Sequence, residues 1–76
     1  MPELPVVSGR EARRVFERAG WEFRRQHGSH MIFTKRGSVV SLSVPDHVEL
    51  ASGTLRKLIR LAGISVEQLV QALRNA

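Results

Sequence analysis

Two histidines, His27 and His30, stand three residues apart with a Gly-Ser pair between them. A Gly-Ser pair between two apolar runs is typical of a tight turn that joins two strands. Such a turn does not require an imidazole on both sides. Histidine is the side chain that exchanges a proton near neutral pH, so this spacing indicates acid–base chemistry at the mouth of a hairpin as a hypothesis to test.

The two histidines differ in their expected positions. A strand is expected over residues 30–36, and along it Met31 and Phe33 point to one face and His30 to the other. Two large apolar side chains favour the core face, so His30 is expected on the open face at the start of the strand. His27 is expected in the turn, where a solvated polar residue is the simplest interpretation. That simple interpretation also stays open for His30.

Other kinds of chemistry find less support in the sequence. Candidate metal ligands exist, but their spacing matches no strong signature, and we expect neither a metal nor another cofactor; these residues are His27, His30, Asp46, His47 and Glu49. The chain has no cysteine, which excludes a thiol nucleophile or a thiolate metal site. No glycine-rich phosphate loop and no serine nucleophile elbow is present.

The charge of the chain indicates a polyanionic partner. Twelve Lys and Arg residues oppose seven Asp and Glu residues, which gives a net charge of +5 in 76 residues, and ten of the twelve cations are arginine. Arginine favours bidentate contacts with phosphate, so nucleic acid is the preferred partner. A solvated basic surface, or one that meets an acidic protein, remains an alternative. No segment reads as a targeting or membrane sequence, and we expect a cytoplasmic protein.

The hydrophobic pattern predicts a single domain over residues 1–76 with an α+β fold. The spacing of apolar residues changes from a period of 3.6 to a period of 2 and back. This pattern predicts one helix, a three-stranded antiparallel meander and two further helices, in the order α-β-β-β-α with a short C-terminal helix. The expected ranges are about 9–19 for the first helix, 21–26, 30–36 and 39–44 for the strands, and 53–62 and 66–74 for the last two helices. The face of the sheet away from the helices should be open and polar.

Capping signals support the helix boundaries. Ser8 and Glu11 form an S-x-x-E capping box before the first helix, and Ser65 and Gln68 stand in the same relation before the last. The last two helices, joined by Gly63, also resemble a helix-turn-helix. Because the final helix begins without basic residues, a packed αα corner is the better interpretation.

Four segments together resemble the HicA family of toxins, also called YcfA-like. They are "SGRE" over residues 8–11, "AGWEFRRQHGSHMIF" over 19–33, "VPDH" over 44–47 and "SGTLRKLIRLAGIS" over 52–65. The G-S-H strand start, the P-x-H and the G-T-L-R helix start are quite specific in this order and spacing, although each is weak singly. The resemblance covers the chain from Ser8 to the last helix.

This resemblance implies a double-stranded-RNA-binding-domain-like fold and an RNA-cleaving toxin of a type II toxin–antitoxin pair. The implied substrate is messenger RNA, and the implied partner is a HicB-type antitoxin protein. The family's active histidine corresponds to His30, and His47 matches the P-x-H position and is expected to border the site. The loop after His47 reads "VELASG", where relatives often carry a Lys-rich segment, so a phosphate contact from that loop is expected to be lost.

The expected mechanism uses the RNA's own 2′-hydroxyl as the nucleophile. His30 would accept that proton as a general base, or protonate the leaving 5′-oxygen, and Gly28 and Ser29 would let RNA approach it. Cationic side chains would stabilise charge on the phosphate, and the candidates are Arg24, Arg25, Lys35, Arg36, Arg56 and Lys57. A single imidazole serves poorly as both base and acid, so a slow enzyme is expected, and we expect no DNA binding by this chain alone.

Two alternatives stay open. One is a non-catalytic double-stranded-RNA-binding module, in which the basic face grips phosphates and 2′-hydroxyls by shape. The other is a pure interaction protein, whose basic face docks an acidic partner.

Overall fold

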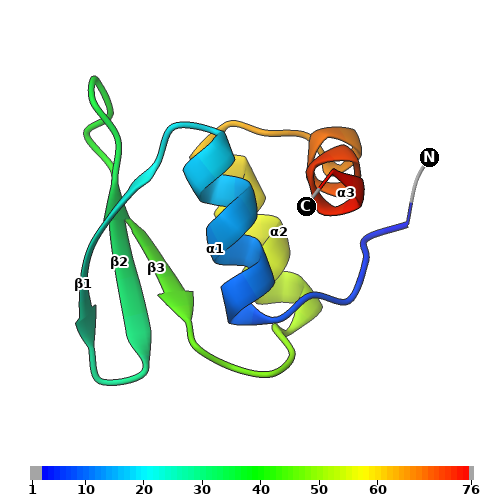
Figure 1. Cartoon of the computed structure of the whole chain (residues 1–76), viewed down its shortest axis with the longest axis horizontal. Helices are drawn as coiled ribbons and strands as arrows, with labels where there is room; N and C mark the ends of the chain where they lie inside the picture. The colour runs from blue at the N-terminus through cyan, green and yellow to red at the C-terminus, as the bar shows by residue number, and fades with distance from the viewer. Residues whose placement is uncertain (1–2, 76) are drawn as a thin grey trace.

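The chain alternates one helix, three strands and two helices. The computed structural model describes residues 3–75, so residues 1, 2 and 76 of the expected domain lie outside the described part. The elements are α1 (Gly9–Arg18), β1 (Glu22–His27), β2 (His30–Thr34), β3 (Leu42–Pro45), α2 (Ser52–Ala62) and α3 (Val66–Arg74) (Figure 1). The three strands form one antiparallel sheet in the order β1-β2-β3. The α+β class and the α-β-β-β-α order are therefore confirmed.

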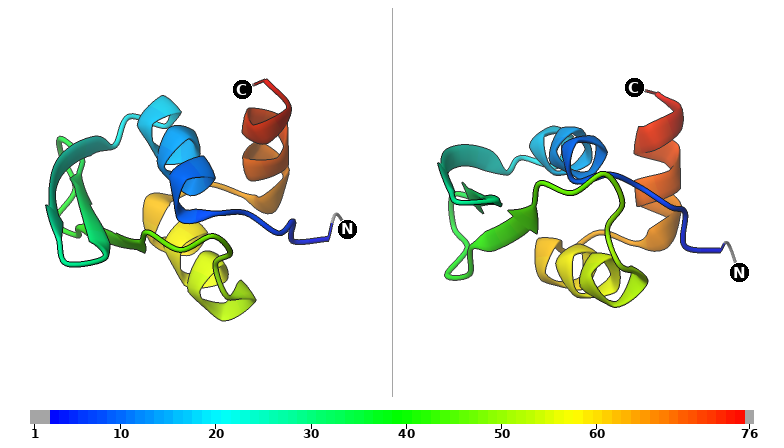
Figure 2. Two further views of the ribbon diagram at one scale, coloured as in Figure 1. Left: turned by 60° about the horizontal axis from the view of Figure 1, so that its bottom comes forward. Right: turned by 90° about the horizontal axis from the view of Figure 1, so that it is seen from below.

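The helices lie in two layers on one side of the sheet. Figures 1 and 2 show α1 and α2 side by side next to the sheet, and α3 on the far side of these two helices. The buried core lies between the layers and includes Phe16, Phe33, Leu42, Leu55 and Leu69. Across residues 3–75, no helix is long and apolar enough to cross a membrane.

The capping boxes expected from the sequence are present at the first and the last helix of the chain, α1 and α3. At α1 the backbone N–H of Glu11 donates to the Ser8 hydroxyl (3.0 Å), and the backbone N–H of Ser8 donates to the Glu11 carboxylate (2.9 Å). Ser65 and Gln68 make the same two contacts at α3. Each reciprocal pair satisfies two helix N–H groups that would otherwise lack partners, which fixes where the helix begins.

The second and third strands are shorter than the sequence pattern predicts. β2 ends at Thr34, and β3 begins at Leu42 rather than near residue 39. Ser38 explains the late start, because its hydroxyl contacts both the backbone N–H and the carbonyl of Val40 at 3.2 Å. These local bonds compete with the ladder for the polar groups of Val40. Val40, within the range 39–44 expected for the third strand, is 38% exposed and lies outside β3.

A bulge in β1 decides which of its side chains share a face. Phe23 pairs with Phe33 and Arg25 pairs with Ile32, so Arg24 is the extra residue between two ladder positions. Phe23 meets Phe33 edge-to-face at 5.7 Å between ring centroids on the helix side of the sheet. Arg25 consequently lies on the opposite face. The expectation of an open, polar outer face is confirmed, because His30 and Ser43 are exposed there.

The first turn of α1 lies directly against the end of β3. The Gly9 backbone N–H donates to the His47 carbonyl at 2.8 Å, and Gly9 is buried. A Cβ at Gly9 would collide with the carbonyl oxygen of Pro45, which is backbone and cannot rotate away. Glycine is therefore required here for close approach rather than for a special backbone angle.

The substitution Gly9→Ala should lower the free energy of unfolding by about 1–3 kcal/mol, because the new methyl group overfills a backbone contact. Gly53→Ala is the matched control, since a Cβ there meets nothing within 4 Å. It should leave stability unchanged or raise it slightly, as alanine favours a helix. Urea unfolding followed by circular dichroism measures both. Equal stability of the two variants would contradict this account of the α1–β3 contact.

Candidate functional site

The two histidines close the β1–β2 hairpin as a directly opposed pair. His27 pairs with His30 across the ladder, and Gly28 and Ser29 form the two-residue turn. Gly28 has a φ of 61°, and a positive φ at the first turn residue alone is the type II′ pattern that requires glycine. The expectation that His27 lies in the turn is wrong, because the turn uses only two residues and β1 extends to its edge.

The face assignment of β2 is confirmed. Met31 is 2% exposed and Phe33 is fully buried, so the alternation leaves His30 on the outer face, where it is exposed. Opposed residues on neighbouring strands share a face, with Cβ atoms about 4.5–5.5 Å apart. Both imidazoles therefore lie on the open face of the sheet, within reach of one bound ligand.

Two hollows meet at His30. We call the first the sheet hollow; it has a volume of about 380 Å³ and is lined by Arg25, His27, His30, Ile32 and Ser43. We call the second the helix hollow; it has a volume of about 390 Å³ and is lined by His30, Ser41, Ser43, Pro45, Thr54, Lys57, Leu58 and Leu61. His30 and Ser43 belong to both. The hollows thus form one continuous groove from β1 across β3 to α2.

One cation stands on each side of the His30 imidazole along this groove. Arg25 comes from β1 and lines the sheet hollow, and Lys57 comes from α2 and lines the helix hollow. A polyanionic chain that follows the groove would meet both cations and pass over the imidazole between them. Such charges attract phosphate and stabilise charge that develops on it.

Several expected phosphate contacts lie away from this groove. Lys35 is five residues beyond His30, roughly 16 Å along an extended strand, and its ammonium lies 5.9 Å from the Trp21 ring centroid. Arg36 follows it at the same end of the sheet. Arg24 donates to the Thr34 hydroxyl at 2.7 Å. Arg56 is exposed on α2 but lines neither hollow.

His47 lies beside the site rather than within it. It lines a third hollow at the start of α1, together with Ser8, Arg10, Asp46 and Val48. Arg10 contacts the Asp46 carboxylate there at 3.4 Å. The Asp46 N–H donates to the Ser29 carbonyl at 2.7 Å, so the backbone joins this hollow to the hairpin turn. Arg10, which we did not select from the sequence, extends the basic surface on this side.

Ser43 is a further residue of the groove that we did not select from the sequence. The only sequence signal for it is the alternation along the third strand, which places Ser43 on the open face. Its position beside His30 depends on the β2–β3 register, in which Ile32 pairs with Ser43 and His30 pairs with Pro45. Nothing local to residues 39–45 specifies that register.

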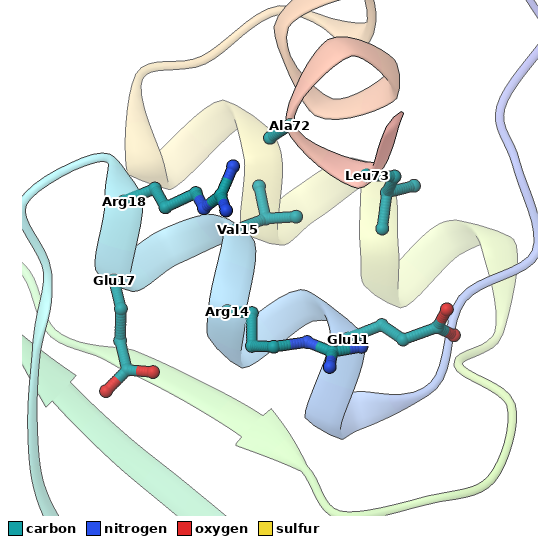
Figure 3. Close-up of a pocket in the computed structure, with 7 residues that line it drawn as sticks. All are labelled: Glu11, Arg14, Val15, Glu17, Arg18, Ala72 and Leu73. Atoms are coloured by element: carbon teal, nitrogen blue, oxygen red, sulfur yellow. The ribbon is translucent and has the colours of Figure 1, made fainter. Parts of the chain in front are cut away.

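A separate, more apolar pocket of about 260 Å³ lies between α1 and α3. It is lined by Glu11, Arg14, Val15, Glu17, Arg18, Ala72 and Leu73. Figure 3 shows Val15 between the two helices and Arg18 extending toward Ala72, while Glu17 points away from α3. The pocket shares no residue with the groove around His30. Its two carboxylates already have partners, because Glu11 belongs to the capping box of α1 and Glu17 contacts Arg13 at 3.4 Å. Over residues 3–75, no three His, Cys, Asp or Glu side chains are grouped to hold a metal.

The comparison with protein families identifies one match. The HicA_toxin family model, described as "HicA toxin of bacterial toxin-antitoxin", matches residues 9–64. This span runs from the first residue of α1 to just beyond α2, and it contains every residue of the sheet hollow and of the helix hollow. Among curated proteins, none matches the chain significantly.

Lys57→Ala should weaken binding of single-stranded RNA, because Lys57 lines the groove beside His30. Loss of one phosphate contact should make the slope of log affinity against log salt less steep by about 0.7. Arg56→Ala removes an equal charge from the same helix outside the groove, and should cost less affinity. Titrations at several salt concentrations compare the two variants. A larger effect of Arg56→Ala would contradict binding of a polyanion along the groove.

Proposed function

Because the chain belongs to the HicA toxin family of toxin–antitoxin systems, we propose that it is an endoribonuclease that cleaves messenger RNA at a phosphate held over His30. Membership makes it the toxin component of a toxin–antitoxin pair and implies an antitoxin partner. The RNA substrate, the cleavage chemistry and the role of His30 are the proposal. The activity belongs in the cytoplasm, where messenger RNA is translated.

The position of His30 in the groove is the observation that carries this proposal. His30 is exposed on the open face, belongs to both hollows, and has a cation on each side in Arg25 and Lys57. Over the described residues, its imidazole has no hydrogen bond to another protein group that a substrate would have to displace. An exposed imidazole between two phosphate-binding cations suits proton transfer at a bound phosphodiester.

The proposed reaction uses the 2′-hydroxyl of the RNA as the nucleophile. The 2′-oxygen forms a bond to phosphorus while the bond from phosphorus to the 5′-oxygen breaks, which yields a 2′,3′-cyclic phosphate and a 5′-hydroxyl. His30 transfers a proton at the 2′-oxygen or at the leaving oxygen, and positioned acid–base catalysis contributes about 10²–10⁴-fold. Arg25 and Lys57 stabilise the charge on the phosphate oxygens. The protein supplies the proton transfer and the charge, so no metal ion is needed.

The proposed partner is a HicB-type antitoxin that covers His30. The groove runs along the sheet face to α2, so a protein that binds across it would exclude RNA from His30. The exposed cations at Arg25 and Lys57 would favour acidic groups on such a partner.

Purified protein should cut single-stranded RNA in the presence of EDTA, and His30→Ala should lower the rate by about 10²-fold or more. DNA of the same sequence should stay intact because it lacks the 2′-hydroxyl. Gel analysis of end-labelled substrates measures the cleavage, and circular dichroism verifies that the variant is folded.

The other outcomes have distinct meanings. If neither protein cuts RNA but both bind it, the chain is a non-catalytic double-stranded-RNA-binding module and the nuclease proposal fails. If both cut equally, the nuclease activity stands but His30 has no part in it. Cleavage of DNA would contradict attack by the 2′-hydroxyl.

A further inference from the structure

The proposed reaction needs two proton transfers, whereas it assigns only one imidazole. A base must accept the 2′ proton and an acid must protonate the 5′-oxygen as it leaves. A single imidazole has to accept the first proton and then pass it to a different oxygen, on the other side of the phosphorus. A second imidazole on the same face removes that limit, because one member can be neutral while the other is protonated.

We propose that His27 is the second acid–base group of this site and acts together with His30 on the same phosphodiester. This inference rests on the proposed ribonuclease function and extends it. The two residues pair directly across the β1–β2 ladder and line the same sheet hollow. Opposed side chains in a sheet have Cβ atoms about 4.5–5.5 Å apart, which allows both imidazoles to reach one phosphodiester.

The hairpin fixes this pairing tightly. A two-residue turn sets the register, and Gly28 supplies the positive φ of 61° that such a turn needs. The turn is held from outside the hairpin, because the Ser29 carbonyl accepts the Asp46 N–H at 2.7 Å. The separation of the two Cβ atoms is therefore set by the backbone, although both side chains are exposed.

The charges around the pair suit a shared phosphate. The charged groups that face it are Arg25 from β1 and Lys57 from α2. No residue that lines the sheet hollow or the helix hollow is acidic. Apart from this arginine and lysine, the two histidines are the only ionisable side chains among the described residues that line the two hollows.

The two proton transfers balance across the imidazoles of His27 and His30. The neutral imidazole accepts the 2′ proton as the bond from the 2′-oxygen to phosphorus forms. The protonated imidazole gives its proton to the 5′-oxygen as the bond from phosphorus to that oxygen breaks. The products are a 2′,3′-cyclic phosphate and a 5′-hydroxyl, and the two imidazoles have exchanged protonation states.

The test compares the pH dependence of RNA cleavage in EDTA for the wild type, His27→Gln and His47→Gln. The wild type should show a bell-shaped profile, because one imidazole must be neutral and the other protonated. His27→Gln should cut about 10²-fold more slowly and lose one of the two limbs. His47→Gln is the matched control, since His47 lies outside both hollows, and it should keep both limbs.

A second substrate separates chemistry from positioning. Sulfur can replace the bridging 5′-oxygen at a site that the wild type cuts, and a thiolate leaves without needing an acid. That substrate should restore the rate of either His27→Gln or a His30→Gln variant, whichever lacks the acid. Two results together support His27 and His30 as an acid–base pair. The sulfur substrate restores the cleavage rate of one of the two variants, and His27→Gln loses one limb of the pH profile.

Two results would overturn the pair while leaving the ribonuclease intact. One is a His27→Gln protein that cuts like the wild type with both limbs. The other is a slower His27→Gln protein that keeps both limbs and gains nothing from the sulfur substrate, because His27 would then only help to hold RNA. An inactive wild type would be a different failure, since it removes the proposed ribonuclease function itself.

Discussion

The backbone of Pro45, Asp46 and His47 is the contact on which the arrangement of the site depends. Pro45 pairs with His30 at the end of the ladder, the Asp46 N–H donates to Ser29 in the hairpin turn, and the His47 carbonyl accepts the N–H of Gly9 at the start of α1. The β1–β2 hairpin and the start of α1, which are distant in sequence, therefore meet on three consecutive residues. The start of α1 can approach the end of β3 closely because Gly9 has no Cβ to collide with the Pro45 carbonyl.

Backbone support of this kind matters because the two histidines of the groove are exposed. His27 and His30 have no core packing to hold them. Their positions instead follow from ladder register and from hydrogen bonds at the turn. The core behind the sheet acts indirectly, since burial of Met31 and Phe33 keeps the opposite face of β2, which carries His30, turned outward.

The basic charge of the chain is divided between different uses. Arg13 packs over the Phe23 ring at 4.1 Å and contacts Glu17 at 3.4 Å, and Lys35 lies over Trp21. Arg25 and Lys57 line the groove around His30. A positive net charge thus indicates the class of partner, but only a minority of the cations can contact a single phosphate. The others cover apolar surface with their side-chain stems or remain solvated.

The sequence by itself determined the elements, both capping boxes and the outward direction of His30, because helical period, strand alternation and caps depend on residues within a few positions of one another. It did not determine the late start of β3, which follows from the hydroxyl contacts of Ser38 with Val40. The two-residue turn at Gly28 and Ser29 makes His27 face His30, which is a local effect. Tertiary structure alone decided that Ser43 lies beside His30 and that Lys57 rather than Lys35 borders the groove. Strand register and helix docking are set by long-range packing, which no short segment encodes.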